Sequence, residues 1–257
     1  MRLSTRLRAA AIFSAKHLGV SLIVAAAAAA LVFGLWFPYP YSELASGKQL
    51  FALVVTVDVI IGPLLSFCVY NPKKPRRELW RDLGVIFFLQ FLALGYGMFS
   101  VTQARPVWLA FEGDRFRVVS VPDIHVNELG RASENFRSLS WVGPKLVGVR
   151  LLEPTDPDFP DSIQLALKGY HSGFRPERWV DFDSQRGRVV KEAKPLAELR
   201  RRYPKRSDLI DKAIERSALS EAELGFVPLA SEGRTDWSVV VSLTDGTPKY
   251  FLPLDAW

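Results

Sequence analysis

Long apolar runs separated by short polar segments dominate the first 101 residues of the chain. Three such runs are present, at about 18–37, 49–70 and 83–101. Each is close to the roughly 20 residues that a helix needs to cross the hydrocarbon core of a bilayer. The pattern predicts a membrane protein in which residues 1–101 form a three-helix N-terminal transmembrane bundle. The first run is too long for the apolar core of a cleaved signal peptide, which usually holds about 7–15 residues.

Two polar side chains interrupt the second and third runs. Asp58 lies near the middle of the second run, where an aspartate costs about 2.5–3.5 kcal/mol on insertion scales. We therefore expect Asp58 to face protein, with Gln90 of the third run as its partner. Three roles stay open: holding the bundle together, meeting a polar group on a partner's transmembrane helix, or relaying a proton. A single carboxylate is too few for a relay chain.

Glycine and proline residues predict local features of the same helices. Pro63, which follows Gly62, lacks an N–H and is expected to kink the second helix. Gly95 and Gly97 are expected to let the third helix approach a neighbour closely.

Residues 102–257 show short apolar runs broken by turn residues, which predicts an α+β domain with an antiparallel sheet. Hairpins are predicted around two turns, from residues 107–111 with 115–119 and from 237–243 with 249–257. A further strand is expected at 145–152, and helices at 161–171, 195–203 and 207–218. Capping residues are expected at Asp123 and at Ser220 with Glu223.

The charge distribution predicts the orientation in the membrane. Residues 102–257 hold 23 basic and 23 acidic residues, so the net charge of +6 comes from the rest of the chain. Residues 1–17 and 71–82 hold nine cations, whereas the loop between the first two runs holds only Lys48. By the positive-inside rule the N-terminus is cytoplasmic and the C-terminal domain is periplasmic. A neutral domain also argues against binding to nucleic acid.

Motifs for catalysis or cofactor binding are absent from the sequence. It contains no G-x-S-x-G, P-loop, C-x-x-C or G-x-G-x-x-G pattern. Asp123, His125 and Glu128 lack the further Cys or His that a four-ligand zinc site needs. The single cysteine, Cys68, allows no intrachain disulfide. We expect a protein that is not an enzyme and has no metal, cofactor or small-molecule substrate.

Three segments of the chain carry a resemblance: VDVIIGPLLSFCVY (57–70), YGMFSVTQARPVWLAFEGDRFRVV (96–119) and FLPLDAW (251–257). Together they resemble the bacterial type IV pilin accessory proteins, the TfpX/TfpZ family. The order of three apolar runs followed by a C-terminal domain is similar too.

The resemblance implies an inner-membrane accessory factor for type IV pilin stability or assembly, and so for pilus biogenesis and twitching motility. Its partners would be the lipid bilayer and the major pilin, through the pilin's transmembrane helix and its periplasmic head. The resemblance implies a partner-binding set, to which the polar pattern adds Gln90: Asp58, Gln90, Gln103, Arg105, Asp114 and Arg115. For Arg105, the alternative is an interfacial anchor that reaches lipid headgroups.

Two other classes of function stay open. A sensor subunit would bind a periplasmic ligand in an apolar pocket with convergent polar groups and signal through helix contacts. A membrane enzyme would need an acid or nucleophile with a perturbed pKa in the C-terminal domain. An accessory protein needs neither of these, but it needs an exposed apolar or edge-strand surface.

A reporter fused after Trp257 tests the predicted orientation. We expect a reporter that works only in the periplasm to be active and one that works only in the cytosol to be inactive. The physical reason is that the flipped chain would carry nine cations to the outer face of the membrane. Activity of the cytosolic reporter alone would contradict the orientation.

Overall fold

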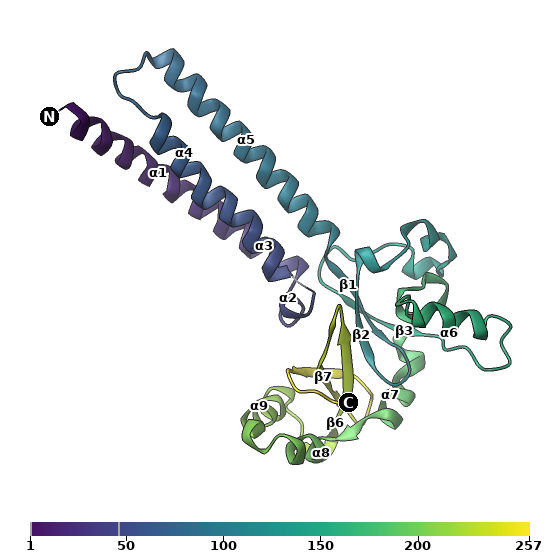
Figure 1. Cartoon of the computed structure of the whole chain (residues 1–257). Helices are drawn as coiled ribbons and strands as arrows, with labels where there is room; N and C mark the ends of the chain where they lie inside the picture. The colour runs from purple at the N-terminus through teal and green to yellow at the C-terminus, as the bar shows by residue number, and fades with distance from the viewer. Residues whose placement is uncertain (1, 46) are drawn as a thin grey trace. The chain divides into compact units, whose positions relative to one another are not determined.

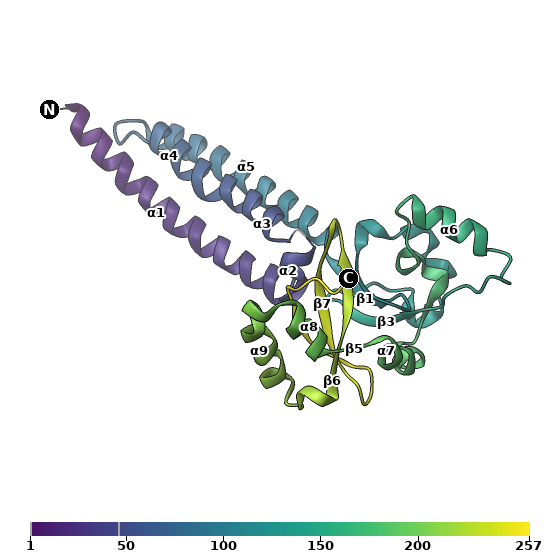
Figure 2. The same ribbon diagram turned by 60° about the horizontal axis from the view of Figure 1, so that its bottom comes forward.

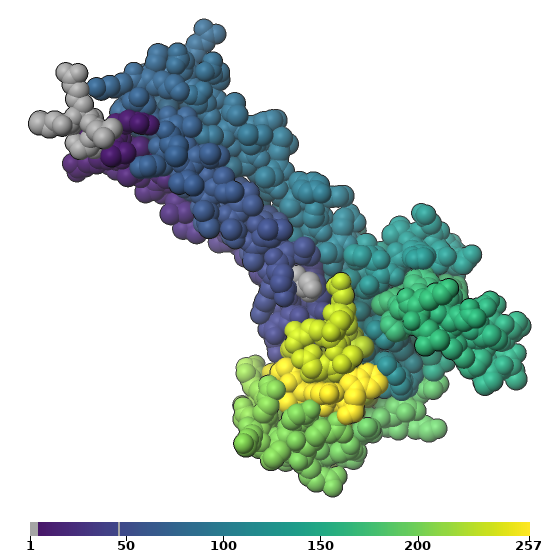
Figure 3. All heavy atoms as spheres, viewed as in Figure 1, coloured from purple at the N-terminus to yellow at the C-terminus, as the bar shows by residue number. Residues whose placement is uncertain are grey.

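The computed structural model describes residues 2–45 and 47–257, and the chain divides into two compact units (Figure 1). The helical unit is Met1–Ala104, and the sheet unit is Arg105–Trp257. In the space-filling view the helical unit runs from purple to blue and the sheet unit from teal to yellow (Figure 3).

Three helical stretches of the first unit are long and apolar enough to cross a membrane: Thr5–Trp36, Gly47–Val69 and Arg76–Gln103. They confirm the three long N-terminal helices that the apolar runs predict, and they indicate association with a membrane. The elements that form them are α1 (Arg2–Leu31), η1 (Val32–Trp36), α3 (Gly47–Thr56), η2 (Val57–Ile61), α4 (Gly62–Val69) and α5 (Arg76–Gln103), with α2 (Tyr41–Leu44) in the first loop.

The helices extend beyond the apolar runs because their charged flanks are also helical. α1 begins at Arg2, and α5 begins at Arg76 directly after Pro75. At its other end α5 stops at Gln103, two residues before Arg105. Pro106 disfavours the helical conformation for the residue before it, which explains this end.

The segment α3–η2–α4 forms one helix against which the other two pack. α1 packs along α4, and α5 packs along both α3 and α4 (Figure 2). Gly97 of α5 allows a close approach, because a Cβ there would lie 2.6 Å from a methyl carbon of Val54. Gly95 has no such neighbour within 4 Å, so the expected close approach is confirmed at Gly97 and wrong at Gly95.

The sheet unit contains one curved, half-barrel sheet with the strand order β4-β3-β1-β2-β6-β7-β8, and β5 pairs with β6 (Figures 1 and 2). The strands are β1 (Pro106–Phe111), β2 (Phe116–Ser120), β3 (Lys145–Val149), β4 (Trp179–Val180), β5 (Lys194–Pro195), β6 (Leu224–Ser231), β7 (Arg234–Ser242) and β8 (Pro248–Leu252).

The sheet is mixed, so the predicted antiparallel sheet is wrong. The hairpins β1–β2 and β7–β8 are antiparallel, as their short turns predict. However, β1 pairs with β3 and β2 pairs with β6 in parallel. Parallel neighbours need long crossover connections, which leave no local signal in the sequence comparable to a hairpin turn.

Four α-helices accompany the sheet: α6 (Phe159–Leu167), α7 (Arg186–Glu192), α8 (Leu196–Arg202) and α9 (Ser207–Ser217). Three of them, α6, α8 and α9, confirm predicted helices. Ser220 and Glu223 form the expected capping box. The predicted N-cap at Asp123 is wrong, because the N-cap of the short 3-10 helix Val121–Asp123 is Ser120. Asp123 is the third residue of that helix and forms a capping box with Ser120.

Two of the hydrophobic clusters in the sheet unit lie at different parts of the sheet. The first gathers residues from β1–β4 and the segment after β2: Val107, Trp108, Ala110, Val119, Val121, Ile124, Ala132, Val147, Val149 and Trp179. The second gathers residues from α8, α9, β6–β8 and the C-terminal segment: Leu196, Leu199, Ile210, Ala213, Leu224, Phe226, Val240, Leu252, Leu254 and Ala256.

The segment 251–257 completes the second core. Leu252, Leu254 and Ala256 are almost fully buried at alternating positions. The last residue is held from two sides: the Trp257 ring lies 4.2 Å from the guanidinium carbon of Arg115, and Arg202 donates to the Trp257 carbonyl oxygen. This part of the family resemblance therefore has a structural role in the fold.

Two turn glycines give a matched test of the fold. Gly246, between β7 and β8, has φ +69°, and a Cβ there would lie 2.6 Å from the carbonyl oxygen of Arg186. Gly233, between β6 and β7, has φ +68° but no such neighbour within 4 Å.

We expect Gly246→Ala to lower the thermal midpoint of the detergent-purified protein further than Gly233→Ala. In both variants an alanine in the left-handed region destabilises the fold by about 1–2 kcal/mol. Only Gly246→Ala adds a clash with the backbone. Equal midpoints for the two variants would contradict this account of the β7–β8 turn.

Candidate functional site

A line of polar residues on α1 faces α4. Ser14, His17 and Ser21 are spaced by three and four residues, which puts them on one face of the helix. Ser14 Oγ donates to the carbonyl oxygen of Pro63 at 2.8 Å, and His17 Nδ1 lies 2.7 Å from Ser66 Oγ in a shared hydrogen bond. His17, Ser21 and Ser66 are all buried. Side-chain hydrogen bonds therefore join two helices inside an otherwise apolar unit.

Asp58 lies in the π-helical turn η2, shortly before Pro63. A carbonyl in a π turn pairs with the N–H five residues later, and for Asp58 that residue is Pro63, which has no N–H. Gln90 Nε2 donates to the Asp58 carbonyl oxygen at 3.2 Å and lies 3.5 Å from the carboxylate Oδ1. Gln90 thus supplies the donor that the proline removes, next to a π turn that precedes Pro63.

Gly62 makes room for this contact. A Cβ at Gly62 would lie 1.9 Å from Gln90 Nε2, closer than any real contact between heavy atoms that are not bonded. The pairing of Asp58 with Gln90 therefore depends on the absence of a side chain at the neighbouring position.

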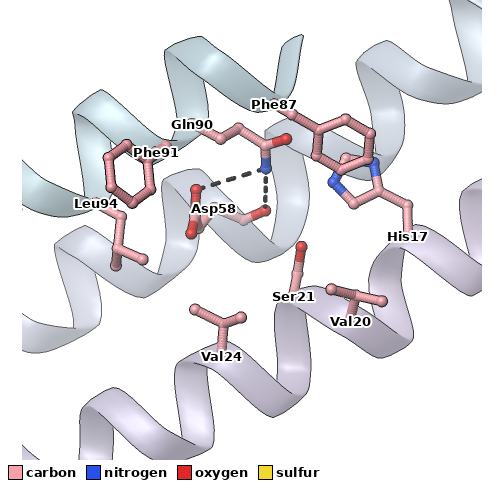
Figure 4. Close-up of a pocket in the computed structure, with 9 residues that line it drawn as sticks. All are labelled: His17, Val20, Ser21, Val24, Asp58, Phe87, Gln90, Phe91 and Leu94. Atoms are coloured by element: carbon pink, nitrogen blue, oxygen red, sulfur yellow. Dashed lines mark hydrogen bonds between the residues drawn. The ribbon is translucent and has the colours of Figure 1, made fainter. Parts of the chain in front are cut away.

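His17, Ser21, Asp58 and Gln90 line a cavity of about 350 Å³ between α1, η2 and α5 (Figure 4). Asp58 and Gln90 face each other across part of it, and the remaining lining residues are His17, Val20, Ser21, Val24, Phe87, Phe91 and Leu94. Gln90 Oε1 is buried and has no hydrogen-bond partner within the described part of the chain. The cavity is therefore mainly apolar, and the unpaired acceptor beside it is buried.

Two further cavities continue the first one along the helices. One shares His17, Val20 and Phe87 with it and adds Phe13. The next shares Phe13 and Phe87 and reaches Tyr70, Arg76 and Trp80. We call these three neighbouring cavities, which share lining residues, the α1–α5 groove.

Of the six predicted partner-binding residues, the structure brings Asp58 and Gln90 together in the helical unit. Gln103 is exposed in the last turn of α5. The other three, Arg105, Asp114 and Arg115, belong to the sheet unit.

Arg105 is turned into its own unit. Its Nε donates to the Ser140 carbonyl oxygen at 3.0 Å, and its guanidinium carbon lies 4.1 Å from the centre of the Trp141 ring. Burial lowers the pKa of Arg105. The interfacial-anchor alternative is wrong for this residue, because an anchor needs an exposed guanidinium and Arg105 is only 5% exposed.

Asp114 and Arg115 pair with each other at the opposite end of β1 from Arg105. Arg115 donates from Nε and Nη2 to the two carboxylate oxygens of Asp114 at 2.8 and 2.6 Å. Hydrogen bonding to this guanidinium lowers the pKa of Asp114. Arg115 also packs on Trp257. These contacts fix the β1–β2 turn to the C-terminal segment, and they do not form one site with Arg105.

A second cavity, of about 260 Å³, lies in the sheet unit beside Arg117, Asp123, His171 and Ser231. Arg117 forms a buried ion pair with Glu112, with Nε 2.8 Å from Oε2. Burial raises the pKa of Asp123 and lowers the pKa of His171. This cavity is smaller than the roughly 300–1,000 Å³ of typical ligand pockets. It also differs from the apolar pocket that a sensor would need.

The residues considered as metal ligands have other contacts. Asp123 accepts the Ser120 N–H at 2.8 Å, His125 stacks on Tyr170 at 4.6 Å between ring centres, and Glu128 accepts the Tyr170 hydroxyl at 3.3 Å. Among residues 2–45 and 47–257, no group of three or more His, Cys, Asp or Glu side chains is placed to hold a metal ion.

Sequence reasoning missed His17, Ser21 and Ser66 as members of the polar cluster. A signal for the first two was present, since polar residues at positions 14, 17 and 21 fall on one face of an apolar helix. Ser66 gave no such signal, because one serine in a transmembrane helix is common and its partner depends on how α1 and α4 pack.

Comparison with known proteins gives the family. A family model described as fimbrial assembly protein FimB matches residues 1–46. The serogroup I fimbrial assembly protein of Dichelobacter nodosus is 35% identical over 90% of this chain and 90% of the relative. The serogroup E1 protein is 34% identical over the same shares. The serogroup C1 and C2 protein is 42% identical over 48% of this chain and 94% of the relative. No solved structure matches the chain.

The apolar helices, the buried polar cluster and the sheet unit thus describe a membrane-associated protein with a separate α+β domain. On the strength of the identity over nine-tenths of its length, the chain belongs to the family of fimbrial assembly proteins.

A glycine pair tests the polar cluster. Gly62→Ala would displace the Gln90 amide and leave the Asp58 carbonyl without its donor, whereas Gly95→Ala meets open space. A buried polar group that loses its partner costs about 1–3 kcal/mol. We expect the detergent-purified Gly62→Ala protein to melt at a lower temperature than wild type and Gly95→Ala to melt at the wild-type temperature. A Gly62→Ala protein as stable as Gly95→Ala would remove the support for the cluster.

Proposed function

We propose that this protein is a non-enzymatic inner-membrane accessory factor that acts on the major pilin during assembly of a type IV pilus. The observation that carries the proposal is the 35% identity, over 90% of the chain, to a protein named for fimbrial assembly. The narrower assignment to the TfpX/TfpZ pilin accessory proteins, which the three resembling segments suggest, is part of the same proposal.

Two features of the molecule fit a binding role. The helical unit has a mainly apolar groove, which is suited to contact another helix within the membrane. The sheet unit has a five-residue strand, β8, at one end of its strand order, and the edge of a sheet is a place where a further strand can add. A partner made of an apolar helix and a globular head, as a pilin is, would meet both features.

The proposed orientation in the membrane is based on the distribution of Lys and Arg. The cations of residues 1–17 and 71–82 favour the cytoplasmic side. The sheet unit is then in the periplasm, where the pilin head would be. Trp141 is 61% exposed and packs on Arg105, the second residue after the last apolar helix. An exposed tryptophan there is suited to the interface between membrane and water.

Deletion of the gene in its natural host tests the proposal. We expect loss of surface pili and of twitching motility, and recovery of both when the gene is supplied in trans. The physical reason is that, without this protein, the pilin would lack a binding partner in the membrane before assembly. Electron microscopy, sheared-pilus yield and a motility assay measure the result.

A matched control separates assembly from expression. The total amount of pilin and its transcript should be measured in the same strains, because loss of pili through loss of pilin synthesis would be a different effect. Normal piliation and motility in the deletion strain would defeat the proposed function.

A further inference from the structure

We propose that residues 137–146 of the sheet unit form a membrane-docking loop, which seats Trp141 and Val142 in the headgroup layer of the bilayer that α5 crosses. The partner of this loop is the lipid surface. The inference needs α5 to span the membrane, for which its length and composition are suited, but it does not depend on a role in pilus assembly.

The docking loop is tied to the end of α5 through Arg105. The helical hydrogen bonds of α5 continue to Ala104, whose N–H donates to the Ser100 carbonyl oxygen at 3.1 Å. Arg105 is the next residue and the first of the sheet unit. Its Nε donates to the Ser140 carbonyl oxygen at 3.0 Å, and its guanidinium carbon lies 4.1 Å from the centre of the Trp141 ring. Trp141 is therefore fixed to a residue that directly follows the membrane-spanning helix.

The chain limits how far Arg105 can lie from the hydrocarbon core. Five of the first seven residues of α5 are charged, so contact with hydrocarbon begins near Leu83. Residues 83–101 then cover about 28 Å of a core that is about 30 Å thick. The Cα atom of Arg105 lies at most about 8 Å beyond that of Val101, because the residues between them are helical. The headgroup layer is about 5–7 Å thick. Arg105 therefore lies in this layer or at its surface.

The tip of the docking loop is held in an outward position. Ser140 Oγ accepts the Val142 N–H at 3.2 Å and donates to the Val142 carbonyl oxygen at 3.3 Å. Gly143, with φ +59°, turns the chain directly afterwards. Ser140 is buried, whereas Trp141 and Val142 are 61% and 67% exposed. The turn thus presents two large apolar side chains away from the sheet unit.

The composition of the loop suits a lipid surface. Residues 135–152 contain three cations, among them Lys145, and no Asp or Glu, although the sheet unit as a whole has equal numbers of basic and acidic residues. Tryptophan is enriched at the level of the headgroups. Lys and Arg near the surface are attracted to anionic lipids. An apolar tip with cations beside it therefore matches both layers of a membrane interface.

A protein partner fits this loop less well. A stable protein interface involves about 20–30 residues on each side, whereas the tip of the loop exposes two apolar side chains. Insertion into the headgroup layer needs no such area, because the gain from burial is roughly proportional to the apolar surface removed from water, however small the patch.

The sheet unit provides a matched control. Trp257 also stacks on an arginine, with its ring centre 4.2 Å from the guanidinium carbon of Arg115, and it is 44% exposed. Arg115 lies at the opposite end of β1 from Arg105, and the six residues of this strand cover roughly 20 Å. Only Trp141 is tied to the end of α5, so lipid should reach Trp141 and not Trp257.

Quenching of a single fluorescent label by lipid tests the depth of the loop. Cys68→Ser removes the only cysteine of the chain, and Val142→Cys or Trp257→Cys then carries the label. The full-length protein is reconstituted in vesicles of phosphatidylethanolamine and phosphatidylglycerol that contain a phospholipid with a nitroxide beside its headgroup. We expect severalfold stronger quenching at position 142 than at position 257. Iodide, dissolved on both sides of the membrane, should quench in the reverse order.

Three results would overturn the proposal. Absence of lipid quenching at position 142 would show that the loop stays in water, and equal lipid quenching at both positions would show that the loop is not selected. Protection of position 142 from iodide without quenching by lipid would assign the loop to a contact with protein, such as a second copy of this chain.

Substitution of Trp141 separates docking from a purely structural role. With the label at position 142, we expect Trp141→Ser to reduce lipid quenching severalfold and Trp141→Phe, which keeps an aromatic ring over Arg105, to retain most of it. The thermal midpoint of each detergent-purified variant shows whether the sheet unit is still folded. Because the label at position 142 in the otherwise unchanged loop gives its own answer, an unfolded Trp141→Ser protein does not remove the test. Full lipid quenching in a folded Trp141→Ser protein would contradict the anchoring role of Trp141.

Discussion

Every polar group that enters an apolar helix bundle must find a hydrogen-bond partner there, and the helical unit is organised by this requirement. Pro63 removes a donor from the middle of the central helix, and the nearby turn widens into a π turn. Gln90 replaces the missing donor, and Gly62 leaves space for it. Ser14 and the His17–Ser66 pair join α1 to the C-terminal part of the same helix. A small number of polar contacts thus determines which helix faces meet.

The sheet unit follows a different physical logic, because its elements bury apolar surface away from water. The two clusters described above are connected by one continuous sheet. Charged residues near the β1–β2 turn are used in local pairs, such as Asp114 with Arg115 and Glu112 with Arg117. Asp114 and Arg115, which the sequence analysis placed in the partner-binding set, therefore stabilise a turn between two strands.

Much of the fold could be predicted because its signals are local. Uncharged runs of about 20 residues define the three long helices, and short turns define the β1–β2 and β7–β8 hairpins. The parallel pairs β1–β3 and β2–β6 could not be predicted, because they depend on crossovers of many residues. The pairing of Asp58 with Gln90 followed from the cost of polar groups in lipid. The involvement of Ser66 and the space beside Gln90 depend on helix packing, which a single sequence does not give.

The position of residues 252–256 in the second core has a consequence for biosynthesis. These residues are made after every strand and helix that they touch, and Leu252, Leu254 and Ala256 fill the space between those elements. Chains emerge from the ribosome from the N-terminus onward. The first core can therefore close during synthesis, while α8, α9 and β6 keep exposed apolar surface until residues 252–256 arrive. Until then, this half of the domain is open to chaperones and to proteolysis.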